Sequence, residues 1–164
     1  MSEVIFGYKR NADIWHPNIE LRFAFYVLEN GDVIIKKYLN DVKIIKTEKI
    51  IIPLAVVENI KKFLTEQKKL IDRLPKKIYS FTIDGCLDCF HFLGNKIYCW
   101  NPERIVGERY KELEFHLGEL SPEMKEVVQQ HNYLLAVFEY VFNLLKDYGL
   151  KVYSWEKLGC EWIV

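Results

Sequence analysis

The sequence lacks the features that would identify a membrane protein, an exported protein or a nucleotide-binding enzyme. No apolar run approaches the ~20 residues that span a bilayer, so we expect no membrane association. The first ten residues contain neither an uninterrupted apolar core nor a small-residue cleavage site, which argues against a secretory signal. Neither GxGxxG nor GxxxxGK[ST] occurs, so there is no Gly-rich phosphate loop. We therefore expect a cytoplasmic protein whose four cysteines stay reduced.

Net charge is also lacking, because 23 Lys and Arg residues balance 23 Asp and Glu residues. The charges are nevertheless segregated: region 33–77 holds twelve basic residues against five acidic ones. Such asymmetry can steer a charged partner, or it can simply solvate a strand pair and a helix. Half of the 164 residues are apolar, a composition that predicts one globular domain over 1–164 with a single core.

Strand signals occur in the first half of the chain. Apolar and polar residues alternate in 21–28, Asn30-Gly31 follows, and 33–38 is again rich in β-formers, so the pattern predicts a hairpin. A further strand is predicted at 49–52, before Pro53. A short strand at 3–8 is predicted within an N-terminal arm.

The segment 79–100 carries two turn signals, Asp84-Gly85 and Gly94-Asn95. They predict three short antiparallel segments, with a strand between the turns that is apolar on both faces. A strand of that kind belongs inside a sheet that has a helix on one side. We therefore predict that this segment forms the centre of the sheet.

Two amphipathic helices are predicted from apolar residues that recur at spacings of three and four. One covers 54–70 after Pro53, and the other follows the capping residue Ser121 and ends near Gly149. A shorter helix is predicted at 108–117, and an edge strand or docked tail at 151–164. Together the elements predict an α+β fold, with an antiparallel sheet of five to six strands packed with two main helices.

Metal-binding residue types gather in the central segment, at Cys86, Cys89, His91 and Cys99. Zinc needs four ligands that converge on a tetrahedron. Cys86 and Cys89 would face opposite sides of a strand, so that only Cys89, His91 and Cys99 could meet, without a fourth ligand. We therefore predict no metal and no cofactor, with thiols that pack as small apolar groups.

No catalytic motif is readable in the sequence. The four histidines, His16, His91, His116 and His131, form no Ser-His-Asp or Cys-His arrangement with nearby residues. His131 interrupts the apolar stripe of the last helix, where we expect a hydrogen-bonded core residue. The absence of a motif favours a non-catalytic protein, although scattered catalytic residues leave a small enzyme open.

Three stretches resemble small bacterial immunity proteins, which bind and neutralise a cognate toxin domain in the cytoplasm. They are the F-x-F-x-V…NGDVII hairpin at 23–35, the IDG turn at 83–85 and the IYCWNP segment at 97–102, and the apolar helix at 123–146 adds to the resemblance. The resemblance implies a non-catalytic protein-binding module. It implies no functional residue, because such inhibitors bind through surfaces and share no catalytic motif.

Charge complementarity selects a candidate surface for such a partner. Nuclease toxins have basic clefts, so their inhibitors need carboxylates, joined by a few anchoring side chains. We therefore predict that the partner-binding residues are Glu108, Glu112, Glu114, Glu119, Glu123, Trp155 and Trp162.

The alternative is a nucleic-acid-associated module that uses the Lys-rich region 33–77 to bind phosphates. Its lysines are Lys36, Lys37, Lys43, Lys46, Lys61, Lys62, Lys68 and Lys69. Only Tyr38 and Phe63 in this region are aromatic residues that could stack on bases, which weakens the alternative.

Overall fold

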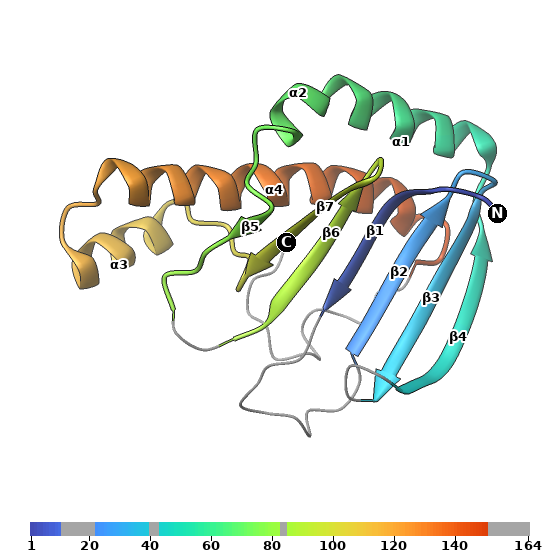
Figure 1. The fold of residues 1–164 in the computed structure, drawn as a ribbon, viewed down its shortest axis with the longest axis horizontal. Helices are drawn as coiled ribbons and strands as arrows, with labels where there is room; N and C mark the ends of the chain where they lie inside the picture. The colour runs from blue at the N-terminus through green and yellow to red at the C-terminus, as the bar shows by residue number, and fades with distance from the viewer. Residues whose placement is uncertain (11–21, 40–42, 83–84, 151–164) are drawn as a thin grey trace.

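The computed structural model describes residues 1–10, 22–39, 43–82 and 85–150. These residues form one seven-stranded sheet in the order β4-β3-β2-β1-β6-β7-β5 (Figure 1). All neighbouring strands are antiparallel except β5 and β7, which pair in parallel. The strands are β1 (Val4–Arg10), β2 (Arg22–Leu28), β3 (Asp32–Leu39), β4 (Lys43–Ile51), β5 (Lys77–Ile78), β6 (Leu87–Phe92) and β7 (Asn95–Trp100).

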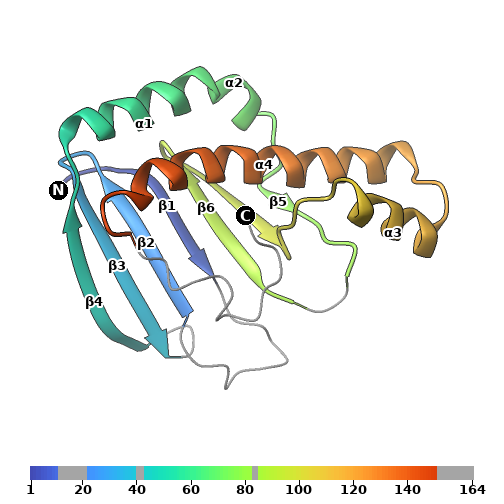
Figure 2. The same ribbon diagram turned by 180° about the vertical axis from the view of Figure 1, so that it is seen from behind.

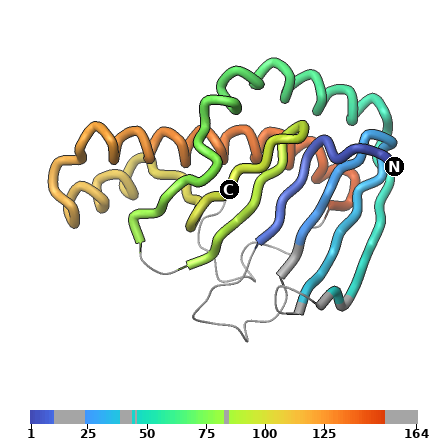
Figure 3. The backbone as a smooth tube through the Cα atoms, viewed as in Figure 1, coloured from blue at the N-terminus to red at the C-terminus, as the bar shows by residue number. Residues whose placement is uncertain are grey.

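Four helices accompany the sheet: α1 (Leu54–Glu66), α2 (Lys68–Ile71), α3 (Glu108–Leu117) and α4 (Pro122–Lys146). Helix α4 runs across one face of the sheet, which Figure 2 shows from the helix side. Figure 1 looks onto the opposite face, where none of the helices in the described residues lies over β1, β2 and β6. The first turns of α4 extend past the sheet, and α3 lies beside them at the end of the molecule, as the backbone path in Figure 3 also shows.

The main core lies between α4 and the sheet. Phe138 sits at its centre, with ring centroids 5.8 Å from Phe6, 5.3 Å from Tyr8 and 5.4 Å from Phe90. Helix α1 adds the buried residues Val57, Ile60 and Leu64 to the same core. A second, smaller cluster of Ile105, Leu113, Leu120 and Val128 holds α3 against the start of α4. Helix α3 is therefore attached through α4 and not through the sheet.

The hairpin predicted at 21–38 is confirmed, because β2 and β3 pair antiparallel around the Asn30-Gly31 turn. The last helix is confirmed as well: the Ser121 side chain accepts a hydrogen bond from the Met124 N–H (3.2 Å), and proline occupies the first turn. The strand predicted at 49–52 is longer than expected, since β4 begins at Lys43. The tail predicted at 151–164 lies outside the described residues.

The α+β class is confirmed, but the prediction of five to six antiparallel strands and two main helices is only roughly right. A third substantial helix, α3, is present besides α1 and α4, and the sheet also differs. It has seven strands and is mixed, because Lys77–Ile78 adds a short parallel strand beside β7. Two residues are too few for periodicity to reveal, although Ile78 is completely buried. The central strand is β1, which lies between β2 and β6, and not the 79–100 segment.

The Asp84-Gly85 signal was wrong as a hairpin turn, because residues 79–82 form no strand. Instead, the Asn101 side chain forms hydrogen bonds with residues that precede and follow the Asp84-Gly85 signal. Its Oδ1 accepts the Cys86 N–H (2.9 Å), and its Nδ2 donates to Ser80 Oγ (3.1 Å) and to the Thr82 hydroxyl. Gly85 has a φ of +143°, and a Cβ atom there would overlap the Asn101 amide.

Replacing Gly85 with alanine is therefore expected to lower the free energy of unfolding by about 2 kcal/mol or more. The change forces an L-residue into a positive-φ region and displaces the Asn101 hydrogen bonds. The matched control is Gly94→Ala, where φ is +87° but nothing lies within 4 Å of the added Cβ. It should cost only about 1 kcal/mol. Urea unfolding of both variants would measure the difference, and equal losses would contradict the role of Asn101.

None of the helices among the described residues is both long and apolar enough to cross a membrane.

Candidate functional site

Four strands place polar side chains in two adjacent rows on the face opposite α4. In the first row, Lys9 on β1 lies opposite Cys89 on β6, which lies opposite Tyr98 on β7. The second row contains four residues, Tyr26 on β2, Gly7 on β1, His91 on β6 and Lys96 on β7. The second row extends over three strand spacings, or about 14 Å.

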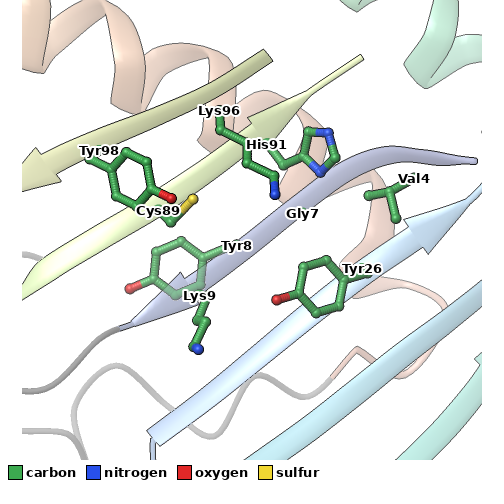
Figure 4. A pocket seen from close by; sticks show the side chains of 9 residues that line it. All are labelled: Val4, Gly7, Tyr8, Lys9, Tyr26, Cys89, His91, Lys96 and Tyr98. Atoms are coloured by element: carbon green, nitrogen blue, oxygen red, sulfur yellow. The ribbon is translucent and has the colours of Figure 1, made fainter. Parts of the chain in front are cut away.

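A hollow of about 420 Å³ lies over these rows, and Gly7 forms part of its floor (Figure 4). A Cβ atom on Gly7 would come within 2.7 Å of Tyr26 Cδ1, so the glycine allows the Tyr26 ring to lie close to β1. Figure 4 shows Lys96 reaching from β7 across β6 toward β1, and the Tyr98 hydroxyl beside the Cys89 sulfur. None of the described residues that line the hollow is an Asp or a Glu.

Burial shifts the pKa values of three side chains around the hollow, Tyr26, Cys89 and His91. Burial, helped by Tyr38 and Cys89, raises the pKa of Tyr26 to about 12. The pKa of Cys89 is also raised by burial, even though Tyr98 and the nearby lysines act in the opposite direction. Burial and Lys96 lower the pKa of His91, while Glu3 raises it, with a net lowering. The Tyr26 hydroxyl and the Cys89 thiol therefore keep their protons at neutral pH.

A second surface lies at the far end of the molecule, where α3 ends and α4 begins. Region 103–126 contains seven acidic residues and four basic ones. Of the acids predicted to bind a partner, Glu108, Glu112, Glu119 and Glu123 are exposed. Glu114, in contrast, is half-buried.

Part of the acidic charge is balanced locally. Lys111 Nζ lies 2.9 Å from Glu108 Oε1, and Arg109 Nη1 lies 3.6 Å from Glu112 Oε2. Glu119 and Glu123 form no ion pair with any residue that the structure describes. The acidic character is therefore strongest at the turn between α3 and α4.

Phe115 is an unexpected member of this surface. It is 85% exposed, more than any other aromatic residue in the described part of the chain. Leu113 turns toward α4 and is buried, and Phe115, two residues later, lies on the opposite side of the helix. Leu117 is also exposed. We call this surface the α3 tip and define it by Glu108, Glu112, Phe115, Leu117, Glu119 and Glu123.

The remaining predicted residues do not join one surface. Trp155 and Trp162 lie outside the described residues. The lysines of region 33–77 are divided between separate parts of the molecule: Lys36 lies on the open face of the sheet near Tyr26, whereas Lys61, Lys62, Lys68 and Lys69 belong to α1 and α2. Region 33–77 thus does not form a single basic face.

A buried charged cluster lies on the helix side of the sheet. Asp88 is completely buried, accepts the Tyr8 hydroxyl at 2.6 Å and pairs with Arg10 through two hydrogen bonds of 3.2 and 3.0 Å. Its carboxylate is therefore paired with a cation and hydrogen-bonded, and Asp88 is not among the residues that line the hollow. The cluster has the character of a structural ion pair.

His131 is a hydrogen-bonded core residue, as the sequence predicted. Its Nε2 lies 2.6 Å from the Tyr79 carbonyl, and its Nδ1 accepts the Glu103 N–H at 3.4 Å. This arrangement fits a neutral imidazole with the proton on Nε2, and burial lowers the pKa of His131. The Cys99 thiol lies 3.7 Å from Nδ1, but burial raises its pKa, so the pair does not form an accessible nucleophile.

The possible convergence of Cys89, His91 and Cys99 does not occur. Cys89 and His91 share the open face, as expected for residues two apart on a strand, whereas Cys99 is buried against His131 on the helix side. Within the described residues, no group of three or more His, Cys, Asp or Glu side chains could hold a metal ion.

Comparisons with family models, with curated proteins and with solved structures find no match to this chain.

Proposed function

We propose that the protein is a non-catalytic, immunity-type inhibitor that binds a cognate bacterial toxin domain through the α3 tip. The observation that carries this proposal is Phe115, a large apolar side chain exposed on a helix that stands clear of the sheet. Aromatic residues at such positions are typical energetic anchors of protein interfaces.

The acids around Phe115 favour a basic partner. Glu112, Glu119 and Glu123 would meet a positively charged surface, such as the phosphate-binding cleft of a nuclease, and would accelerate its association. The α3 tip is also attached through its own small core, so binding there would leave the sheet undisturbed. These features support a basic protein partner with an apolar pocket.

The test uses the whole chain as bait for partners in its native cells, with the variants Phe115→Ala and Glu112→Lys/Glu119→Lys/Glu123→Lys. The expected partner is a toxin domain whose activity falls stoichiometrically when the protein is added. Phe115→Ala should weaken the equilibrium dissociation constant by roughly thirtyfold, the effect of losing an anchor worth about 2 kcal/mol. The charge variant should lower the association rate at low salt, and added salt should remove the difference.

The matched controls lie on α1, away from the tip. Leu54→Ala removes another exposed apolar residue, and Glu58→Lys reverses another exposed acid. Neither should change binding. A partner that is not inhibited, or a toxin that binds the Phe115 and charge variants as tightly as the native protein, would overturn the proposal.

A further inference from the structure

We propose that the hollow on the open face of the sheet binds a nucleoside phosphate, with Lys9 and Lys96 holding the phosphoryl group and the base against Tyr98. The hollow lies on β1, β2, β6 and β7, and the α3 tip lies beyond the sheet at the end of the molecule. The two proposals therefore rest on different residues.

Donor chemistry is the first argument. The polar residues that line the hollow are two lysines, three tyrosines, a cysteine and a histidine, and none of the described lining residues is acidic. Phosphoryl oxygens only accept hydrogen bonds, so they are matched by a set of donors that includes ammonium groups. A cationic ligand would meet no carboxylate among these lining residues.

Size is the second argument. A volume of about 420 Å³ lies within the roughly 300–1,000 Å³ range of small-molecule sites. The floor spans four strands, which is far longer than a phosphate ion and leaves room for an organic group beside it. Tyr98 is 37% exposed at one border of the hollow, and such a ring can stack on a base.

Lys9 and Lys96 must be able to reach the ligand. The Lys9 ammonium lies over the Tyr38 ring, 4.9 Å from its centroid, and Figure 4 shows it below the hollow. An exposed cation–π contact is weak compared with a charge-assisted hydrogen bond to phosphate, so Lys9 can turn toward the ligand. Lys96 already extends over the hollow.

A nucleoside phosphate can be free or part of a single-stranded nucleic acid, and the two share the chemistry that the hollow recognises. Calorimetric titration of the whole protein with adenosine monophosphate, adenosine and inorganic phosphate tests the site. Adenosine monophosphate is expected to bind with a dissociation constant in the millimolar range or tighter, and adenosine about tenfold more weakly.

A single-stranded oligothymidylate that binds much more tightly than the mononucleotide would identify nucleic acid as the source, and equal or weaker binding would identify a free nucleotide.

Three variants assign the contacts. Lys9→Met/Lys96→Met should weaken binding of adenosine monophosphate and of phosphate by about tenfold or more, and Tyr98→Leu should weaken only the former. Lys62→Met, an exposed lysine on α1, is the matched control and should change neither. Circular dichroism of each variant confirms folding. Absence of binding to the native protein, or binding that is unchanged in the double lysine variant, would overturn the proposal and leave the α3 tip unaffected.

Discussion

Replacing Asp88 with alanine is expected to lower the free energy of unfolding by about 3–5 kcal/mol, as is typical when one member of a buried ion pair is removed. Asp88 is 0% exposed and accepts three hydrogen bonds, from Tyr8 and from two nitrogens of Arg10. The alanine variant keeps the Arg10 guanidinium buried and removes the Asp88 carboxylate that pairs with it. Urea denaturation followed by circular dichroism measures the loss.

A second variant separates the lost ion pair from the lost volume. Tyr8→Phe/Arg10→Met/Asp88→Leu replaces all three polar groups with apolar side chains of similar size. Because a whole buried ion pair can be replaced at little cost, this variant should recover most of the stability lost in Asp88→Ala. If Asp88→Ala instead costs less than about 1 kcal/mol, the range of an exposed pair, the buried ion pair between β1 and β6 does not stabilise the fold.

The elements that the sequence predicted well are those with local signals. The β2–β3 hairpin has Asn30-Gly31 between alternating strands, and α4 has a capping serine followed by proline. The central position of β1 had no such signal. Its sequence, VIFGYKR, lacks regular alternation, and its partner β6 lies about eighty residues away, as the Tyr8–Asp88 bond shows. Long-range pairing of this kind is decided by the whole core and not by local propensity.

The difference between local signals and long-range pairing also explains why the sequence predicted the surface on α3 but not the hollow. Helix α3 occupies the predicted range, Glu108–Leu117, and most of its predicted acids are exposed. Phe115 could have been found from helical periodicity, because it lies opposite the buried Leu113. The hollow could not have been found, since it depends on the register of four strands and on Gly7 lying beside Tyr26 and His91.

Replacing Phe138 with alanine is the second change expected to have a large effect, again about 3–5 kcal/mol of unfolding free energy. The Phe138 ring is 1% exposed and lies among aromatic rings from three strands, including Phe6 and Phe25 at 5.8 and 6.3 Å and Phe90 at 5.4 Å. Alanine removes these contacts and leaves a cavity between α4 and the sheet, which rigid strands fill only in part. Thermal and urea unfolding would measure the loss.

Phe115→Ala is the matched control for Phe138, because the same change is made on an exposed ring. It should alter stability by no more than about 0.5 kcal/mol, so any loss of partner binding in that variant would reflect the interface alone. Phe138→Leu keeps most of the volume and should cost less than Phe138→Ala, because the surrounding rings retain a neighbour. Similar stability losses for Phe138→Ala and Phe115→Ala would contradict the position of Phe138 at the centre of the core between α4 and the sheet, since only a buried ring can leave a cavity behind.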